Sequence, residues 1–336
     1  MPITIRDIAK IAGVSHSTVS RSLNDSPLIS EEQKTKIKEL ARELGFEFNA
    51  SARGLSRGKT GSIALIFPEY FDRFSINLFF SSLQSNIRNV FEREGIDVVV
   101  AFPKNRFTGE SNIQKLVSRR KVDGVLIINN EVDGMDVKLM NEAGIPYVFV
   151  HKHPPDMLEC DADYFCTDHF AGGYLAGKRL ISSGKKKLMC ISAIGEEFDA
   201  RTGGFEAALK DSGLSLDRRL ILYGDCTFEY GIKAATENII PGGQIDGVFC
   251  QTDFMALGVV QGLVRSGIKV PEQVSVVGYD DIELDSFFTP ALTTIHQPSK
   301  EIATLASERL IEHLKGKRRK KHEHKMVTPS LVIRDT

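Results

Sequence analysis

Near the amino terminus, four polar side chains recur at spacings that would place them on the outer face of a short helix. They are His16, Ser17, Ser20 and Arg21. An arginine fork can donate two hydrogen bonds to a guanine, and short polar side chains can reach base edges or phosphates. The sequence contains no nucleophile–base pair and no metal-ligand constellation. We therefore expect hydrogen-bonded recognition, with no enzyme activity, no metal and no cofactor.

Three short helices must position these side chains. Thr4 and Ser15 are residue types that cap helix amino termini, and Ser30 begins a Ser-Glu-Glu-Gln capping box. Gly13 and Gly45 would end the first and third helices, and apolar residues recur at helical spacing inside them. Two short helices joined by a tight glycine turn make a helix-turn-helix. Its second helix would lie in the major groove of DNA, with its first residues at the base edges.

Charge and composition set limits on the class of protein. The net charge of the chain is −1, with +3 on residues 1–60 and −4 on the remainder. The positive charge of the amino-terminal part favours its binding to the phosphates of a nucleic acid. The 336 residues predict two or three domains. No apolar run reaches the roughly 18 residues of a membrane span, and no signal peptide is evident, so we expect a cytoplasmic protein. The five cysteines lack CxxC spacing and are expected to be reduced thiols.

A long motif begins at Thr4 and continues to Arg21. It reads Thr4-Ile5-Arg6-Asp7-Ile8-Ala9-Lys10-Ile11-Ala12-Gly13-Val14-Ser15, followed by Thr18-Val19-Ser20-Arg21. In this form it resembles the head of the lactose repressor/purine repressor family of bacterial transcriptional regulators. The resemblance implies that an all-α head, residues 1–48, binds operator DNA. The DNA-binding residues that it implies in this head are Thr4, Ser15, His16, Ser17, Thr18, Ser20, Arg21 and Asn24.

The segment that follows, residues 49–60, resembles the hinge helix and linker of the same family. The DNA-binding residues implied here are Asn49, Ala52, Arg53 and Leu55. Leu55 matches a leucine that wedges between base pairs in the minor groove, which bends the duplex. Gly54 lowers helix propensity by about 1 kcal/mol relative to alanine, as suits a helix that folds only on DNA. The alternative is an interdomain linker with an incidental leucine.

From residue 61 onward, short β-branched runs alternate with helical patterns. The runs are Ile63–Phe67, Val98–Phe102, Val125–Ile128, Tyr147–Val150, Leu188–Ser192, Leu220–Tyr223, Gly247–Cys250, Val274–Val277 and Thr293–His296. This alternation predicts parallel sheets covered by helices on both faces. So many strands favour two doubly wound lobes with a cleft at the carboxyl ends of the strands.

The resemblance extends over this region, residues 61–336, and implies an effector-binding and dimerisation domain. It is an α/β two-lobed domain similar to periplasmic sugar-binding proteins. The resemblance places lobe one at about 61–163 and 296–324, and lobe two at about 164–293 and 325–336, with Leu331–Ile333 as the last strand. Three crossings between the lobes would then form a hinge.

The resemblance also assigns residues to the cleft. Arg201 matches the arginine that grips the effector, and Asp280 matches its carboxylate partner. An arginine fork and a carboxylate suit a polyhydroxyl ligand, which offers many donors and acceptors. For Phe79 and Phe80 the alternative is packing in the core, which we expect for at least one of the two. For Asp253 the alternative is helix capping. The complete set of expected effector-binding residues is Phe79, Phe80, Asn129, His151, Arg201, Cys226, Phe228, Thr252, Asp253, Asp280 and Gln297.

Two residues depart from the family pattern inside the expected cleft. Cys226 stands where relatives carry an aromatic residue that stacks on the ligand, and Phe228 would replace that ring if the loop is rearranged. His151 stands where relatives carry an aspartate. Neither lactose nor a purine can therefore be transferred to this chain as its effector.

The sequence predicts a dimeric repressor of a near-palindromic operator, because two-fold symmetry of the protein requires matching half-sites. A mono- or disaccharide that releases the protein from DNA is the first expectation for the effector. A nucleobase or other small metabolite acting as corepressor is the second. A sugar-binding transport protein would share the body of the chain but not the helix-turn-helix. No carboxyl-terminal heptad repeat is present, so we expect dimers rather than tetramers.

Overall fold

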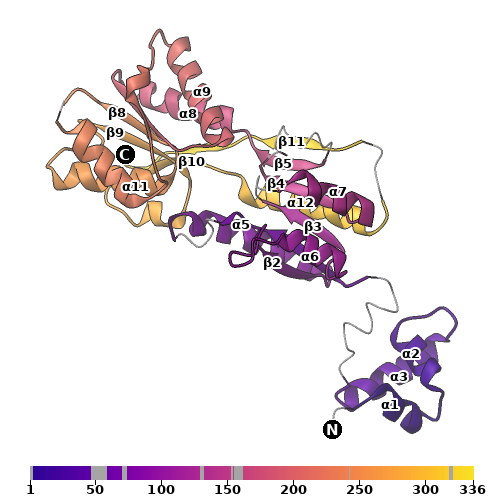
Figure 1. Ribbon diagram of the computed structural model, residues 1–336. Coiled ribbons are helices and arrows are strands. Elements are labelled where there is room, and N and C mark those ends of the chain that lie inside the picture. Colours follow the sequence, from indigo (N-terminus) through magenta and orange to yellow (C-terminus); the bar gives the residue numbers. More distant parts are fainter. Residues whose placement is uncertain are drawn as a thin grey trace. The chain divides into compact units, whose positions relative to one another are not determined.

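The computed structural model describes residues 3–46, 59–69, 74–128, 132–152, 154, 162–241, 243–317 and 321–336 (Figure 1). The chain forms two compact units. One holds Met1–Gly61 together with Arg120–Asp123, and the other holds the rest of the chain. We refer to the helices of the first unit as the head and to the second unit as the body.

The head is built from three helices, as the sequence predicts. They are α1 (Ile5–Ala12), α2 (His16–Leu23) and α3 (Glu31–Glu43). Thr4, Ser15 and Ser30 cap them, each accepting a hydrogen bond from the backbone N–H three residues later. The buried apolar side chains recur at helical spacing and form a small core of Ile8, Ala9, Val19, Ile37 and Ala41.

Lobe one of the body contains a parallel sheet with the strand order β11-β5-β4-β3-β1-β2. Its strands are β1 (Ser62–Ile66), β2 (Asp97–Ala101), β3 (Gly124–Ile127), β4 (Tyr147–His151), β5 (Tyr164–Thr167) and β11 (His324–Val327). Its helices are α5 (Phe74–Arg93), α6 (Asn112–Ser118), α7 (Gly134–Ala143) and α12 (Ser299–Leu314). Among the described residues, no helix of the chain combines the length and apolar character needed to cross a membrane.

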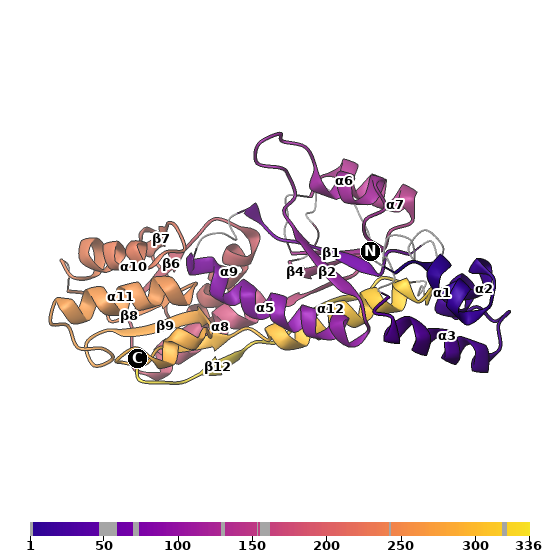
Figure 2. The same ribbon diagram turned by 90° about the horizontal axis from the view of Figure 1, so that it is seen from below.

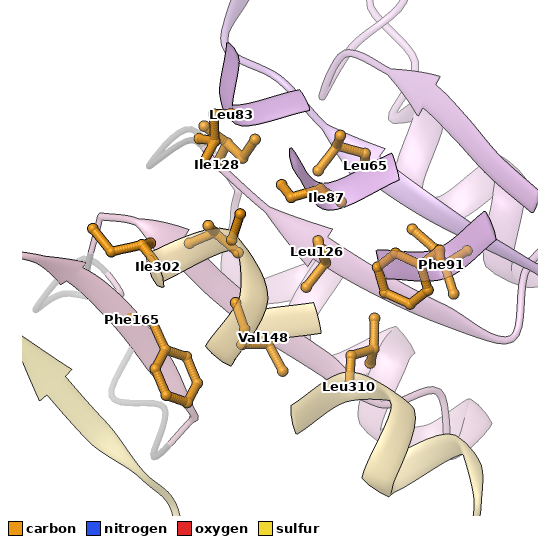
Figure 3. Packing of buried hydrophobic residues seen from close by; sticks show 14 of the residues in the cluster. Leu65, Leu83, Ile87, Phe91, Leu126, Ile128, Val148, Phe165, Ile302 and Leu310 are labelled. Atoms are coloured by element: carbon orange, nitrogen blue, oxygen red, sulfur yellow. The ribbon is translucent and has the colours of Figure 1, made fainter. Parts of the chain in front are cut away.

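Helices α5 and α12, far apart in the sequence, lie side by side on one face of this sheet (Figures 1 and 2). Side chains from strands and helices interdigitate there, since every second strand residue points to the same face (Figure 3). The buried residues labelled there are Leu65, Leu83, Ile87, Phe91, Leu126, Ile128, Val148, Phe165, Ile302 and Leu310. This packing fixes the carboxyl ends of the strands, where ligands bind in sheets of this kind.

Lobe two contains a second sheet with the order β12-β10-β9-β8-β6-β7, parallel except for β12. Its strands are β6 (Leu188–Ser192), β7 (Ile221–Tyr223), β8 (Gly247–Cys250), β9 (Ser275–Asp280), β10 (Thr293–His296) and β12 (Ser330–Val332). Its α-helices are α8 (His169–Ser182), α9 (Glu196–Asp211), α10 (Phe228–Ala234) and α11 (Asp253–Arg265). Short helical turns are η3 (Arg218–Leu220), η4 (Ala235–Ile239) and η5 (Glu283–Ser286).

Both faces of the second sheet are covered, as the alternation of runs predicts. Leu188 and Cys190 of β6 pack against α8 and α9, whereas Met189 and Ile191 pack on the side of α10 and α11. Figure 1 shows α8 and α9 on one side of β8 and β9, and α11 on the other. A strand buried on both faces is apolar throughout, which explains why these runs do not alternate in polarity.

The chain passes between the lobes three times, after β5, after β10 and after β11. The expected boundaries need a correction. Residues 164–167 form β5 of lobe one, and 325–327 lie in β11 of the same sheet, although both were expected in lobe two. The sequence gives little indication of which lobe these two segments join. The residues of β11, His-Lys-Met-Val, form no apolar run, and the lobe is decided by the pairing of β5 with β4 and of β11 with β5.

Candidate functional site

The exposed face of α2 carries the polar residues singled out in the sequence. His16, Ser17 and Arg21 are exposed, while Val19 on the opposite face is fully buried in the head core. Ser20 is half-buried. The guanidinium and the two short side chains therefore face solvent from a fixed helix, which is the arrangement that base-edge contacts in a major groove require.

Other expected DNA-binding residues also shape the helix ends. The Ser15 hydroxyl lies 2.8 Å from the hydroxyls of Ser17 and Thr18 and accepts from the Thr18 N–H at 3.1 Å. The Thr4 hydroxyl donates a hydrogen bond to the Asp7 carboxylate at 2.7 Å, as part of a capping box. The side-chain amide of Asn24 donates to the Ser20 carbonyl at 2.9 Å. Their hydrogen bonds order the turn and the start of both helices, so any contact with DNA is additional to this role.

Some expected residues fall outside the described part of the chain. These are Asn49, Ala52, Arg53 and Leu55 in the expected hinge helix, and Asn129 in the expected cleft. Their assignments remain predictions from the sequence.

A cavity of about 620 Å³ lies between the lobes of the body. The described residues that line it are Phe79, Phe80, His151, Lys152, Ala193, Ile194, Gly195, Glu197, Phe198, Arg201, Tyr223, Gly224, Asp225, Cys226, Tyr230, Thr252, Asp280 and Gln297. Eight of them were expected from the sequence: Phe79, Phe80, His151, Arg201, Cys226, Thr252, Asp280 and Gln297. The volume lies within the range of roughly 300–1,000 Å³ typical of small-molecule sites.

Arg201 of α9 is buried in the cavity wall and is 3% exposed. Its Nη1 donates to the Gln251 carbonyl at 2.6 Å, and its Nε donates to Nδ1 of His169 at 3.3 Å. The guanidinium also lies over the Tyr279 ring, 3.8 Å from its centroid. These contacts hold the fork rigid, and a rigid fork binds oxygen atoms with less loss of side-chain freedom than a mobile one.

Asp280, at the end of β9, faces the same cavity. Its Oδ1 accepts from Nε2 of Gln297 at 2.7 Å, and Gln297 in turn accepts from the Thr167 hydroxyl at 2.9 Å. Burial, reinforced by the nearby Asp253 carboxylate, raises the pKa of Asp280 to about 8. The raised pKa favours the protonated carboxyl, which can donate a hydrogen bond as well as accept one.

His151 ends β4 on the lobe-one side of the cavity and is 6% exposed. Its ring centroid lies 4.9 Å from that of Phe79 and 5.4 Å from that of Phe80. Burial, aided by the positive charge of Lys152, lowers its pKa to about 3, so the imidazole is neutral. Its Nδ1 is buried without a hydrogen-bond partner among the described residues. An orphaned polar atom in a cavity wall is what a ligand hydroxyl would satisfy.

Backbone strain coincides with the two cavity residues His151 and Asp280. Their φ angles are 71° and 129°, in the region that residues other than glycine rarely adopt. Such conformations persist only where the surrounding structure imposes them, and they gather at ligand-binding sites.

The core packing expected for at least one of the two residues Phe79 and Phe80 is confirmed, since Phe80 belongs to the lobe-one core and also lines the cavity.

Two expected effector residues do not line the cavity. Phe228 begins α10 and packs on the lobe-two core, its ring centroid 6.3 Å from that of Phe288. Asp253 is fully buried, where its carboxylate accepts from the Thr294 hydroxyl at 2.6 Å and the Ile282 N–H at 3.1 Å. Both residues follow cavity residues closely in sequence, and helix geometry turns them away from the ligand space.

The thiol of Cys226 does line the cavity, and burial raises its pKa to about 12. Cys166, Cys190 and Cys250 are likewise free thiols, and all three are buried. Thr252, also on the cavity wall, caps α11 through its side chain. The Cys226 thiol is neutral and the Thr252 hydroxyl already accepts a hydrogen bond from the Met255 N–H. Neither group therefore supplies a charge that would attract a charged ligand.

Sequence reasoning missed several residues of the cavity wall. They include Lys152, Glu197, Phe198, Tyr223 and Tyr230. Lys152 and Tyr223 lie at the carboxyl ends of β4 and β7, a position that marks ligand contacts in parallel sheets and would have identified them. Glu197 and Phe198 lie in the first turn of α9, and the sequence does not indicate that this turn faces the lobe-one strands.

Comparisons with known proteins agree with this geometry. A family described as bacterial regulatory proteins, lacI family, matches residues 4–49, and a periplasmic binding protein-like domain matches residues 178–336. The HTH-type transcriptional repressor PurR of Vibrio vulnificus (strain CMCP6) is 32% identical over 336 residues, covering 99% of this chain and 98% of that protein.

Solved structures show the same architecture. A transcriptional regulator CelR–cellobiose complex is 27% identical, with a TM-score of 0.73, and the match covers 99% of both chains. A lac repressor dimer bound to operator and the anti-inducer ONPF has a TM-score of 0.80 over 100% of this chain and 99% of that one, at 23% identity.

Proposed function

The chain belongs to the lacI family of bacterial regulatory proteins and is a DNA-binding transcriptional repressor, and from this premise we propose that a small carbohydrate bound between its lobes controls its affinity for operator DNA. The observation that carries the proposal is the rigid Arg201 guanidinium together with the Asp280 carboxyl in a cavity with aromatic walls. Donors and acceptors at fixed positions match the hydroxyls of a mono- or disaccharide. The aromatic rings suit the apolar faces of a sugar ring.

The proposed mechanism couples this cavity to a dimer on DNA. Two heads bind the halves of a near-palindromic operator through His16, Ser17 and Arg21, while Leu55 of each hinge wedges into the minor groove. Effector binding changes how the lobes pack and releases the protein from DNA. A hundredfold preference of the ligand for one state supplies about 2.7 kcal/mol, which is ample for such a shift.

A nucleobase corepressor is the second candidate. It is favoured by the full-length similarity to the PurR repressor and by the rings of Phe79, Phe198, Tyr223 and Tyr230 around the cavity, which could stack on a planar base. Cys226 and His151 distinguish the cavity from the family pattern.

A thermal-shift screen of the purified protein against neutral sugars and nucleobases separates the candidates. A ligand at about 100 times its dissociation constant adds about 2.7 kcal/mol of stability. Gel shifts on the upstream DNA of its own gene then test the response, and we expect a stabilising sugar to weaken the complex. Operator binding that no sugar alters and that a nucleobase strengthens would replace the carbohydrate with a corepressor.

The Arg201→Ala variant links the cavity to the response. We expect it to bind operator like the wild type but to lose the response to the effector, because the heads do not use this residue. An unaltered effector response in this variant would contradict the assignment of Arg201.

A further inference from the structure

A strongly basic segment surrounds the end of α6. Residues 111–122 contain the cations Lys115, Arg119, Arg120 and Lys121 and no acidic residue. The side chains of Arg120 and Lys121 are exposed, and neither forms an ion pair with any residue that the structure describes. The chain from residue 61 onward carries a net charge of −4. The turn formed by residues 119–123, which we call the basic turn, is therefore a local excess of positive charge on an acidic part of the chain.

The basic turn lies beside the end of the hinge segment. The Asp123 carboxylate accepts hydrogen bonds from the backbone N–H groups of Thr60 and Gly61, each at 2.7 Å. Gly61 directly precedes β1, and Asp123 directly precedes β3, which pairs with β1. Arg120–Asp123 and Met1–Gly61 accordingly belong to the same compact unit. Asp123 thus holds the basic turn against the point where the hinge segment ends.

The backbone of the basic turn is fixed in a conformation that arginine rarely adopts. Val122 is 1% exposed, so its burial anchors the turn. Arg119 is the C-cap of α6, and Arg120, the next residue, has a φ of 47°. Glycine is the usual residue at this position, because it adopts the left-handed backbone without strain. An arginine that is unfavourable for the local fold indicates that its charge serves another purpose.

A duplex held by the hinge segment would lie within reach of the basic turn. The proposed function places Leu55 in the minor groove, and the chain from Leu55 to Thr60 spans at most about 18 Å when fully extended. Phosphates border the minor groove on both sides, and their attraction for cations acts over about 10 Å at 0.1 M salt. The long side chains of Arg120 and Lys121 extend this reach further.

We propose that Arg120 and Lys121 bind phosphates of the operator, so that lobe one supplies a DNA contact in addition to those of the head and the hinge segment. The inference rests on the proposed position of the hinge segment in the minor groove. Phosphate contacts carry no sequence information, so the basic turn strengthens binding without selecting the operator. It also offsets the repulsion between the acidic body and the duplex.

The test measures operator affinity at a series of salt concentrations for the wild type and for Arg120→Gly/Lys121→Gln. Fluorescence anisotropy with labelled DNA from upstream of the gene gives the affinity, and no effector is present. A dimer carries the basic turn twice, and each lost phosphate contact lowers the slope of log affinity against log salt concentration by about 0.9. We expect the slope to decrease in magnitude by about 1.8 to 3.6, and the affinity at 0.1 M salt to fall at least about tenfold. Arg120→Lys keeps the charge and should keep the wild-type slope.

The matched control is Lys186→Gln/Lys187→Gln, which removes two adjacent exposed lysines before β6 of lobe two. Their backbone N–H groups also donate to a carboxylate, that of Asp246, at 2.8–3.0 Å. The hinge segment enters lobe one and not lobe two, so the control should keep the wild-type slope.

Three results would overturn the proposal. They are an unchanged slope in Arg120→Gly/Lys121→Gln, an equal decrease in the lobe-two control, and an equal decrease in Arg120→Lys, which would trace the effect to structure instead of charge. Glycine relieves the backbone strain at position 120, so the double variant should fold. Lys121→Gln alone repeats the comparison if it does not, with an expected decrease of about 1.8.

Failure of this proposal is distinguishable from failure of the proposed function. The measurement contains no effector, so a cavity that binds no sugar leaves the slopes unaffected. Leu55→Ala in the same titration reports on the hinge segment and should weaken operator binding. Full affinity of Leu55→Ala together with a lower slope in the basic-turn variant would refute the wedge and uphold the phosphate contact. A weakened Leu55→Ala together with an unchanged slope would refute the phosphate contact alone.

Discussion

Arg21 and Arg201 are the same residue type in two regions that use it differently. Arg21 is exposed on α2, and the residues that orient it lie within the same short motif. Arg201 is 3% exposed, and its contacts, His169, Gln251 and Tyr279, come from distant parts of lobe two. The head thus presents its recognition groups through local helix geometry, whereas the cavity depends on long-range packing. Damage to packing should therefore affect the cavity first.

The largest expected effect concerns the packing of α8 on α9. A Cβ at Gly173 would lie 1.9 Å from the Arg201 carbonyl oxygen, a backbone atom that cannot move aside. We expect Gly173→Ala to destabilise the body by about 3 kcal/mol or more, as severe overpacking does. Urea unfolding measures the loss.

Gly203→Ala in α9 is the matched control for this packing test. Its Cβ would meet only the Phe170 ring at 3.8 Å, and alanine should stabilise this helix by up to about 1 kcal/mol. Equal unfolding midpoints for the Gly173 and Gly203 variants would show that the close packing of α8 on α9 at Gly173 does not contribute to the stability of the body.

Arg21→Ala should weaken operator binding by about 1–3 kcal/mol per half-site, because a bidentate base contact contributes that much discrimination. The body should keep its stability and its effector affinity. Gel shifts on operator and on scrambled DNA separate base reading from phosphate contact. A uniform loss on both DNAs would assign Arg21 to the phosphate backbone instead.

The buried His151 should make the stability of the body depend on pH. Its pKa is about 3 in the folded protein and about 6.5 when unfolded. Between these values only the unfolded chain binds the proton, so the contribution of His151 to stability is full above about pH 6.5 and declines as the pH falls toward 3. Acidification from pH 7 to pH 5 should remove about 2 kcal/mol of this contribution, while the raised pKa of Asp280 changes stability in the opposite direction.

His151→Asn tests this pH dependence, because asparagine tolerates the left-handed backbone and does not titrate. On acidification from pH 7 to pH 5 its melting temperature should fall less, or rise more, than that of the wild type, because the loss due to His151 is absent. His16→Asn, on the exposed face of α2, is the control and should keep the wild-type pH dependence. A wild-type pH dependence in the His151 variant would assign the titration to other groups.

The smallest expected effect lies in the head. Ser30 caps α3 by accepting from the Gln33 N–H at 3.4 Å, and replacing such a cap by alanine lowers stability by about 1 kcal/mol. The body should be unaffected by Ser30→Ala. Operator affinity at a temperature where the head stays folded should match the wild type. A large loss of affinity under those conditions would give Ser30 a direct role on DNA.

The head could be predicted from the sequence more completely than the body. Every helix of the head could be predicted, because caps such as Thr4 and Ser15 and core residues such as Val19 act within a few residues of one another. In the body, the apolar runs gave most strands to within a few residues. The polar β11 was missed, since its pairing with β5 and not its composition makes it a strand.

Within the cavity, sequence and structure contributed differently. Family resemblance assigned Arg201, Asp280 and His151 to the cleft, and they line the cavity, but it also included Asp253 and Phe228, which face the core. It gave no indication of the pair formed by Lys152 and Glu197, because their contact joins two lobes and their spacing in the chain carries no pattern.

The sequence by itself indicated a helix-turn-helix head and a two-lobed α/β body, because caps, turns and apolar periodicity are local properties, and the resemblance of its first motif to a repressor family indicated a regulator. Only the tertiary structure decided which side chains surround the cavity and in what protonation state. Burial raises the pKa of Asp280 and lowers that of His151, and the pairing of Lys152 with Glu197 satisfies the charges of both. Desolvation and long-range pairing depend on the surroundings of a residue in space, which its neighbours in sequence do not specify.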